Sequence, residues 1–467
     1  MTISLPATDR QIRMLLLLAA VSFAPALAFY YVGEEAIFPI TSLEMWHQRE
    51  WIRQPLFGQN LMHNPLYNWL IISSAALLGW EYMLPVARAL TIAATLATAG
   101  VVAWLAGRLA RDAVFGRCAA LVYLTLSDVL LYRGWLAYVD PLFGFFVFAA
   151  IATLWVACAE DRPRLIAVAV VSLTCAFMSK AFTAYVFYAV ALLVLFLQTP
   201  YRRVLLRPDS IALHVAALAA PLAWLAWLPK NIGQGTRMFN EILAKLVPDN
   251  PLGYLGQVTG FPLETAVRLM PALAIVVYLL WTRRAVTAPY ARLLRIAAWI
   301  AFINYLPYWF APHANVRYLM PIYPVIALAF ACVLWSAWQT SARLILRWLA
   351  AAVVVKFAAA VIIFPYYQSH YRGENYTLAA RAIIARTAGH ELYTTDVSAS
   401  GLSVAGYIDA WRYPQSPPLR WAPGQWESGF VLAYTPDPQL GRVAERYQLG
   451  GNDLYLLCRG AACDAAH

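Results

Sequence analysis

The chain has 467 residues, of which 62% are hydrophobic and only 13% are charged. Soluble proteins carry roughly twice that charged fraction, so the composition excludes an ordinary soluble enzyme. Apolar runs long enough to cross a bilayer recur from Met14 to Pro365. The sequence therefore predicts a polytopic helical membrane protein.

The formal net charge of +11 comes mostly from arginines in short segments between apolar runs. The clusters are Arg108, Arg111 and Arg117; Arg162 and Arg164; Arg202, Arg203 and Arg207; Arg283, Arg284, Arg292 and Arg295; and Arg343 and Arg347. They fall between alternate predicted spans, which is the positive-inside pattern of a membrane protein. This placement argues against a nucleic-acid partner, which would need one continuous basic face.

About eleven membrane spans are predicted if the N-terminus lies inside. They cover approximately residues 14–32, 84–107, 116–132, 141–158, 165–179, 182–199, 209–228, 263–282, 296–311, 318–338 and 345–364. Ala26-Leu27-Ala28 resembles a signal-peptide cleavage site, but retention as the first span is expected because many spans follow. An odd number of spans puts the C-terminal residues outside, and it puts every basic cluster inside.

Two domains are expected: a transmembrane domain over residues 1–365 and a small soluble α/β domain over residues 366–467. Residues 33–83 form a first outer loop with amphipathic helices around Pro39–Trp51 and Leu66–Leu78, and residues 230–262 form a second, mobile outer loop. In the tail, Thr377–Thr387 is predicted as a helix, and Glu391–Tyr393, Phe430–Tyr434 and Leu454–Cys458 are predicted as strands. Cys458 and Cys463 could form a disulfide outside the cytoplasm or remain two free thiols.

Two adjacent acids, Glu34 and Glu35, follow the first apolar run. They can be a solvated helix end or a general base that takes a proton from an acceptor hydroxyl. Downstream in the same loop, His63 and Asn64 precede a Pro-Leu-Tyr segment that includes Tyr67. This segment opens a predicted helix, where an anion would be favoured.

Further polar residues fall at the outer ends of predicted spans. Asp140 opens a span before a proline and can be an ordinary helix cap or a second functional acid. Three cations, Arg133, Lys180 and Arg317, run against the positive-inside bias, although snorkelling explains part of this. A transporter would instead concentrate ionisable groups near the membrane midplane. Acids that activate a hydroxyl and cations that hold a leaving phosphate fit transfer from a lipid-phosphate donor.

The order of these motifs resembles the membrane-embedded GT-C glycosyltransferases, in particular the bacterial aminoarabinose transferases of lipid A and the protein O-mannosyltransferases. The resemblance covers roughly residues 10–335. It is carried by the Glu34-Glu35 pair, the Pro-Leu-Tyr segment, Ala87-Arg88, Asp140-Pro141-Leu142, Met178-Ser179-Lys180, and Arg317-Tyr318-Leu319-Met320-Pro321 with Pro324.

The resemblance implies an inverting transfer of a sugar from a polyprenyl-phosphate carrier, without a metal or other cofactor. It implies that the catalytic residues are Glu34, Glu35 and Asp140, and that the donor-phosphate and substrate contacts are His63, Tyr67, Arg133, Lys180, Arg317 and Tyr318. The implied location is the bacterial inner membrane, with the N-terminus cytoplasmic and the C-terminal domain periplasmic. The implied acceptor is lipid A, another envelope glycan or a protein.

The sequence departs from the aminoarabinose branch at three places. Glu34 replaces the usual aspartate, His63-Asn64-Pro65 replaces Lys-Pro-Pro, and Met62 stands where an acid that contacts an amino sugar is expected. These differences weaken the prediction of aminoarabinose without affecting the general reaction. The alternatives are a transporter or flippase of lipid-linked glycans, and a non-catalytic subunit whose tail binds a partner.

Overall fold

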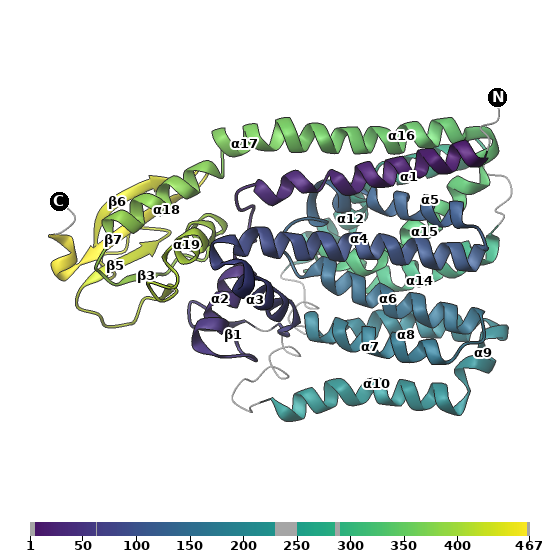
Figure 1. Cartoon of the computed structure of the whole chain (residues 1–467), viewed down its shortest axis with the longest axis horizontal. Coiled ribbons are helices and arrows are strands. Elements are labelled where there is room, and N and C mark those ends of the chain that lie inside the picture. The colour runs from purple at the N-terminus through teal and green to yellow at the C-terminus, as the bar shows by residue number, and fades with distance from the viewer. Residues whose placement is uncertain (1–4, 62, 229–249, 285–289, 465–467) are drawn as a thin grey trace. The chain divides into compact units, whose positions relative to one another are not determined.

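The computed structural model describes residues 5–61, 63–228, 250–284 and 290–464. The chain divides into two compact units (Figure 1). The first comprises Met1–Ala24, Thr91–Trp135 and Val139–Phe357, and the second comprises Pro25–Leu90, Leu136–Tyr138 and Ala358–His467. The first outer loop thus shares a unit with the C-terminal segment, whereas the sequence-based division placed it with the spans.

The first unit is a bundle of helices. Its helices are α1 (Leu5–Val21), α4 (Met83–Ala110, shared with the second unit), α5 (Ala113–Leu124), η3 (Asp128–Arg133), α6 (Asp140–Ala159), α7 (Arg164–Ser179), α8 (Thr183–Phe196), α9 (Thr199–Leu205), α10 (Pro208–Trp227), α12 (Pro251–Arg268), α13 (Ala272–Trp281), α14 (Ala291–Phe310), η5 (Val316–Ile322), α15 (Tyr323–Ser336) and α16 (Trp338–Ala358). Helix α6 is buried along almost its whole length and packs against α7, α8 and η5. A helix that is apolar all round is expected at such a central position.

Seven helical segments in the described residues are long and apolar enough to cross a membrane. They are Thr8–Ala28, Trp80–Ala110, Asp140–Ala159, Pro208–Trp227, Ala291–Phe310, Val316–Ser336 and Trp338–His370. With the multi-pass fold described below, they confirm the predicted fold class. The predicted count was eleven, and three of those spans coincide with the shorter helices α5, α7 and α8. Helix α7, with 16 residues, extends about 24 Å, less than the roughly 30 Å of a hydrocarbon core.

The predicted span 263–282 is not straight. Helices α12 and α13 are bent by 98° across a short break, and they count as an eighth span only if taken together. Pro271 lies in this break, where it has no N–H to continue the ladder of helix α12. The predicted loop 230–262 is also wrong at its end, because α12 begins at Pro251 and the Asn250 side chain accepts from the Gly253 N–H. Residues 229–249 of that loop lie outside the described residues.

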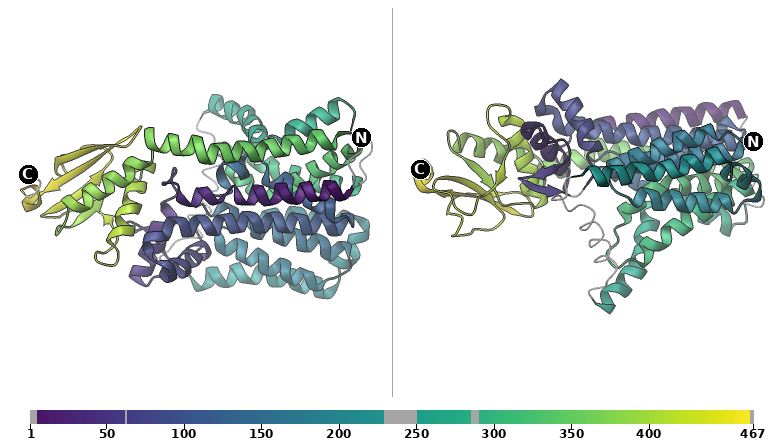
Figure 2. Two further views of the ribbon diagram at one scale, coloured as in Figure 1. Left: turned by 45° about the horizontal axis from the view of Figure 1, so that its top comes forward. Right: turned by 90° about the horizontal axis from the view of Figure 1, so that it is seen from below.

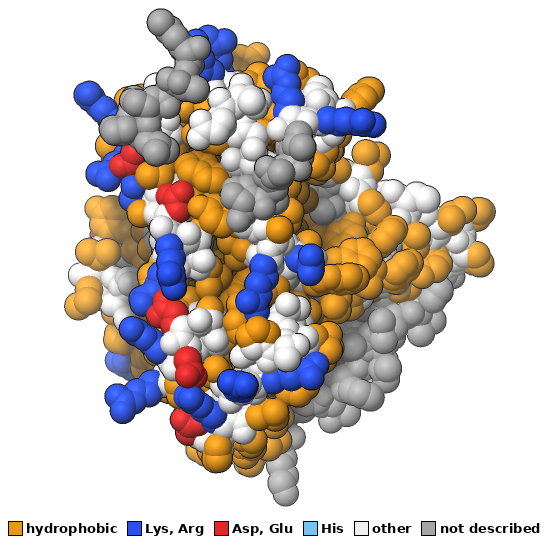
Figure 3. All heavy atoms as spheres, turned by 90° about the vertical axis from the view of Figure 1, so that its right-hand side faces the viewer, with side chains coloured by type: hydrophobic (Ala, Val, Ile, Leu, Met, Phe, Trp, Pro, Cys, Tyr) orange, Lys and Arg blue, Asp and Glu red, His pale blue; other side chains and the backbone are white. Residues whose placement is uncertain are grey.

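Basic side chains gather at one end of the first unit (Figure 3). Several are paired with acids at the same end, for example Arg108 with Glu160 at 2.7 Å and Arg117 with Asp9 at 2.6 Å. The clusters predicted to share one side of the membrane therefore share one end of the bundle. That this end is cytoplasmic stays a prediction.

The second unit joins the first outer loop to the C-terminal segment. The loop contributes η1 (Ala24–Ala28, which begins at the edge of the first unit), α2 (Ile37–Gln48), the hairpin β1 (Gln54–Leu56) and β2 (Gln59–Leu61), α3 (Leu66–Leu78) and η2 (Trp80–Tyr82). The C-terminal part contributes η6 (Ala359–Ile363), α17 (Phe364–His370), α18 (Glu374–Arg386), β3 (Leu392–Thr394), α19 (Ala399–Arg412), β4 (Arg420–Trp421), β5 (Gly429–Ala433), β6 (Arg442–Gln448), β7 (Asp453–Arg459) and η7 (Gly460–Cys463).

The C-terminal strands form one mixed sheet in the order β4-β3-β5-β7-β6, drawn in yellow and yellow-green in Figure 2. Strand β3 is parallel to β4 and β5, while β7 is antiparallel to β5 and β6. The predicted helix and three strands are confirmed as α18, β3, β5 and β7. Helix α19 and strands β4 and β6 were not predicted. A disulfide joins Cys458 to Cys463.

A shared core holds the first outer loop to the C-terminal helices. Its buried members come from α2, α3, the α3–α4 junction and α19, namely Leu43, Met45, Ile72, Ala75, Trp80, Met83 and Ala410. Every residue from Phe38 to Met45 of α2 is buried, so the predicted one-sided amphipathic helix is wrong there. The Trp421 N–H also donates to the Phe57 carbonyl at 3.0 Å, which ties the β1–β2 hairpin to β4.

Two buried carboxylates lie in this second unit. Glu44 accepts from the Phe57 and Gly58 N–H groups at 2.5 and 3.1 Å. Asp409 accepts from the Leu419 N–H at 2.8 Å through one oxygen, while its other oxygen has no hydrogen-bond partner in the described chain. Burial raises the pKa of Glu44 to about 8 and that of Asp409 to about 7. Both groups therefore favour the protonated form in the folded protein.

We predict that the thermal stability of the protein falls as the pH rises from about 4 to about 8. The unfolded chain releases these two protons near the ordinary pKa values of 3.8 and 4.5, whereas the folded chain holds them until about pH 7 and 8. The substitution Asp409→Asn keeps the accepting oxygen and cannot ionise. Its melting temperature should therefore fall less between pH 5 and pH 9 than that of the wild type, by about 3 °C or more. The exposed Asp464→Asn is the control, and equal pH dependence in all three proteins would contradict the prediction.

Candidate active site

The two adjacent acids have opposite environments. Glu35 is fully buried and forms a two-pronged ion pair with Arg88, with Nε–Oε1 at 2.9 Å and Nη2–Oε2 at 2.5 Å. It also accepts from the Ala137 N–H at 2.7 Å and the Val32 N–H at 2.8 Å. A buried carboxylate with this many donors is held in place, and it has little capacity left to bind a substrate.

Arg88 secures the same turn from the other side. Its remaining N–H groups donate to the carbonyls of Ala26, Phe29 and Tyr30 at 2.5 to 2.8 Å. The arginine therefore satisfies the end of the short helix η1 and the segment that leads to Glu35. This cluster lies wholly in the second unit.

Glu34 is exposed, in contrast with its neighbour. Within the described ranges its carboxylate makes no hydrogen bond or ion pair, while its N–H donates to the Tyr138 hydroxyl at 3.2 Å. The preceding Gly33 has a φ of +60°, and a Cβ there would lie 3.1 Å from the same hydroxyl. The turn thus requires glycine and presents Glu34 outward on a fixed backbone.

His63 and Tyr67 lie in the same unit, near the start of α3. Tyr67 is fully buried, and its hydroxyl donates to the Ala87 carbonyl at 3.0 Å. The rings of His63 and Tyr67 lie 5.9 and 5.2 Å from the Phe38 ring. His63 and Asn64 directly precede α3, as predicted. Tyr67 supports the fold in this arrangement, and its contact with a substrate stays a prediction.

In the first unit, Asp140 lies at the start of α6 and forms an ion pair with Lys180, which follows the end of α7. The Lys180 ammonium also lies 5.1 Å from the Tyr318 ring centroid and 5.8 Å from that of Phe143. Ring faces attract such a cation. Asp140 and Lys180 are mostly buried, with 9% and 15% of their side chains exposed.

Two further predicted cations belong to this group. Arg317 lies in η5 with its guanidinium 5.4 Å from the Tyr318 ring centroid. Arg317 and Arg133 are both close enough to act electrostatically on the Asp140 carboxylate. The structure therefore brings together Asp140, Lys180, Arg133, Arg317 and Tyr318 at helix ends opposite the arginine-rich end of the first unit.

Asp128 holds Arg133 in place, although Asp128 was not predicted as a site residue. Buried Asp128 accepts from Arg133 Nη1 and Arg268 Nη1, each at 2.8 Å, and from the Tyr323 hydroxyl at 2.9 Å. Arg133 also reaches Asn315 at 3.4 Å. Arg88 was noted only as part of a motif. Because a charge inside a predicted span needs a partner, Arg88 and Asp128 could have been identified as members of ion pairs.

Comparisons with known proteins give a match to one family model and matches to solved structures. Residues 258–414 match the model of the Alg9-like mannosyltransferase family. The fold is similar to that of ArnT from Cupriavidus metallidurans, in structures bound to undecaprenyl phosphate and in the apo state. Each comparison gives a TM-score of 0.67 and covers 97% of this chain and 98% of ArnT, at 14% and 13% sequence identity respectively. A sequence search of the curated proteins finds no match.

These findings confirm the predicted resemblance to the GT-C glycosyltransferases, and they support the prediction that the chain is a glycosyltransferase. The long apolar helices of the chain, together with this fold, indicate a multi-pass membrane protein. At this level of identity, the structural likeness carries the fold and does not assign the individual site residues.

We predict that the two acids differ sharply in their effect on stability. Glu35→Ala leaves Arg88 buried without its counter-ion, which should destabilise the second unit by about 3 to 5 kcal/mol. The matched substitution Glu34→Ala removes an exposed side chain and should change stability by less than about 0.5 kcal/mol. Thermal unfolding in one detergent measures both. Similar melting temperatures for the two variants would show that the Glu35–Arg88 pair does not hold the turn.

Proposed function

We propose that this chain, with its GT-C fold, is an inverting glycosyltransferase that takes a sugar from a polyprenyl-phosphate carrier. The acceptor is a hydroxyl or phosphate group on the outer face of the membrane. The observation that carries this proposal is the division of labour between the adjacent acids. Glu35 is held by four donor contacts, whereas Glu34 is exposed on the same rigid turn.

Glu34 is the proposed general base. It takes the proton of the acceptor hydroxyl as the acceptor oxygen attacks the anomeric carbon of the sugar. The new glycosidic bond forms while the bond from that carbon to the phosphate oxygen breaks. The polyprenyl phosphate leaves with the bonding electron pair, and the proton remains on Glu34. A single displacement of this kind inverts the configuration of the anomeric carbon.

Cations stabilise the negative charge that grows on the departing phosphate. We assign this role to Lys180 and Arg317, with contributions from Arg133 and His63, while Tyr318 provides a ring face for Lys180. Asp140 keeps the Lys180 ammonium in position and can also orient the acceptor. Glu35 is a positioning residue, since its oxygens are occupied by Arg88 and two backbone N–H groups. No metal ion or other cofactor is required in this proposal.

The chain connects the two groups of residues through a short segment. Ala137 and Tyr138 make hydrogen bonds to the Glu34-Glu35 turn, and Asp140 follows Tyr138 by two residues. This continuity supports the proposal that both groups serve one reaction. It also gives Tyr138 a role in holding the backbone of the proposed base.

The ArnT structure that contains undecaprenyl phosphate supports a carrier of the same chemical class here. We propose a bacterial inner-membrane location, with the reaction on the periplasmic side. Lipid A or another cell-envelope glycan is the proposed acceptor. Because the sequence departs from the aminoarabinose branch at residues 62 to 65, we do not propose aminoarabinose as the sugar.

We predict that Glu34→Gln abolishes transfer without unfolding the protein. An amide cannot take the acceptor proton, and loss of a general base costs typically 10²- to 10⁴-fold in rate. Purified protein, a labelled polyprenyl-phosphate sugar and an envelope lipid extract allow the transferred label to be counted. Glu81→Gln is a control on another exposed acid of the first loop. Normal transfer by Glu34→Gln would contradict the assignment, and movement of intact donor without transfer would indicate a flippase.

We also predict that Lys180→Gln weakens binding of undecaprenyl phosphate by about tenfold or more, because a charge-assisted contact contributes about 1.5 to 3 kcal/mol. Arg343→Gln is the matched control, since it removes one positive charge at the opposite end of the same unit. Binding is measured by titration of the purified protein in detergent. Equal affinities for wild type and Lys180→Gln would exclude Lys180 from the phosphate site.

A further inference from the structure

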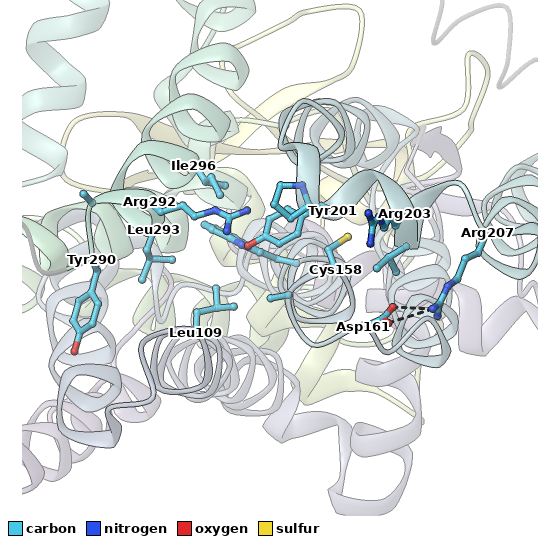
Figure 4. Close-up of a pocket in the computed structure, with 15 residues that line it drawn as sticks. Leu109, Cys158, Asp161, Tyr201, Arg203, Arg207, Tyr290, Arg292, Leu293 and Ile296 are labelled. Atoms are coloured by element: carbon cyan, nitrogen blue, oxygen red, sulfur yellow. Dashed lines mark hydrogen bonds and ion pairs between the residues drawn. The ribbon is translucent and has the colours of Figure 1, made fainter.

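A cavity of about 750 Å³ lies at the arginine-rich end of the first unit, away from the residues proposed for catalysis. It is enclosed by the end of α6, by α9 and by the start of α14 (Figure 4). Helix α6 begins at Asp140 and ends at Ala159 beside this cavity. Its 20 residues extend about 30 Å, which is the thickness of a hydrocarbon core. The cavity and the Asp140–Lys180 pair are therefore at opposite ends of one span.

One part of the cavity wall is apolar and well packed. Its buried members are Trp155, Cys158, Tyr201, Val204, Leu293 and Ile296. Their exposed fractions are all below 9%, so the wall is built into the bundle rather than formed by loose surface side chains. Such a wall is suited to hydrocarbon, and the volume is in the range of pockets that hold small ligands.

The other lining side chains are strongly basic. The lining includes three arginines, Arg203, Arg207 and Arg292, and one acid, Asp161. Arg207 is paired with Asp161 at 3.1 Å, as the dashed lines in Figure 4 mark. In the described part of the chain, Arg203 and Arg292 have no carboxylate within 4.0 Å. The Arg292 guanidinium instead lies over the Tyr201 ring, 4.6 Å from its centroid.

We propose that this cavity binds the phosphate headgroup of an anionic membrane phospholipid, with part of an acyl chain against the apolar wall. Arg203 and Arg292 supply the charge that the phosphate needs, and the Tyr201 ring keeps Arg292 at the mouth of the cavity. Basic pockets between spanning helices suit anionic headgroups in this way. A free phosphate ion would use the arginines but would leave the apolar wall unfilled.

A lipid at this position would join α6, α9 and α14. A ligand that binds only the folded protein stabilises it, by an amount that rises with the logarithm of ligand concentration above the Kd. The proposed lipid is therefore structural, and its effect is independent of the sugar-transfer reaction. The proposal stands or fails separately from the assignment of Glu34.

The test uses the purified full-length protein, delipidated in detergent, with phosphatidylglycerol, phosphatidylcholine and inorganic phosphate as separate probes. Native mass spectrometry counts bound lipid, and thermal unfolding reports stabilisation. The double variant Arg203→Gln/Arg292→Gln should bind phosphatidylglycerol about tenfold less tightly or weaker. The double variant Arg343→Gln/Arg347→Gln removes the same charge at the same end outside the cavity, and it should bind like the wild type.

A steric variant provides a second test that leaves the charge unchanged. Ala291 lines the cavity at the start of α14 and is exposed, so Ala291→Trp should occlude it and lower phosphatidylglycerol binding even if the double variant fails to fold. Equal binding by Ala291→Trp and wild type would overturn the proposal. So would equal losses in the two arginine double variants, or phosphatidylcholine binding as tight as that of phosphatidylglycerol. If inorganic phosphate alone saturates the site and displaces the lipid, the cavity is a free-anion site and the lipid proposal is wrong.

Discussion

A buried, two-pronged ion pair between Glu35 and Arg88 determines the geometry of the outer turn. A charge on either side chain alone would be very costly at full burial, so each side chain requires the other. Arg88 extends this constraint to three carbonyls of the preceding segment, and Glu35 extends it to the N–H of Ala137. Residues 26–35 and Ala137, which are far apart in the sequence, are thereby held against each other. Glu34 then projects from a backbone that has little freedom to move, which is the requirement for a well-positioned base.

Buried ion pairs also fix side chains in the first unit, where acids hold cations in place. Asp128 is buried among Arg133, Arg268 and Tyr323, and Asp140 is paired with Lys180. In each case a carboxylate holds cations at a helix end where the positive-inside pattern does not expect them. Cations that are oriented in advance lose little energy in reorganising when a phosphate departs. At the arginine-rich end most cations are exposed, and the cavity there is lined by arginines together with buried apolar side chains.

Much of the fold could be predicted from the sequence, because spans and basic clusters depend on local composition. The 98° bend within the predicted span 263–282 could not be predicted, since it depends on packing of α12 against α14 and η5 and of α13 against α15. Helix α19 was missed because its Gly and Ser residues favour helix weakly, and its burial depends on packing against α18, α2 and η2. In the candidate site, the motif residues could be named from the sequence, but the different environments of Glu34 and Glu35 could not be predicted. That difference depends on Arg88, 53 residues beyond Glu35, and no local pattern contains it.

The proposed chemistry is a single displacement of the sugar with Glu34 as the base, and the stereochemistry of the product tests it most directly. The anomeric configuration of the product can be determined by proton NMR after transfer from a polyprenyl-phosphate sugar of known configuration. A single displacement predicts complete inversion at that carbon. Retention of configuration would require a double displacement or an attack from the face of the leaving phosphate, and it would contradict both the mechanism and the role assigned to Glu34.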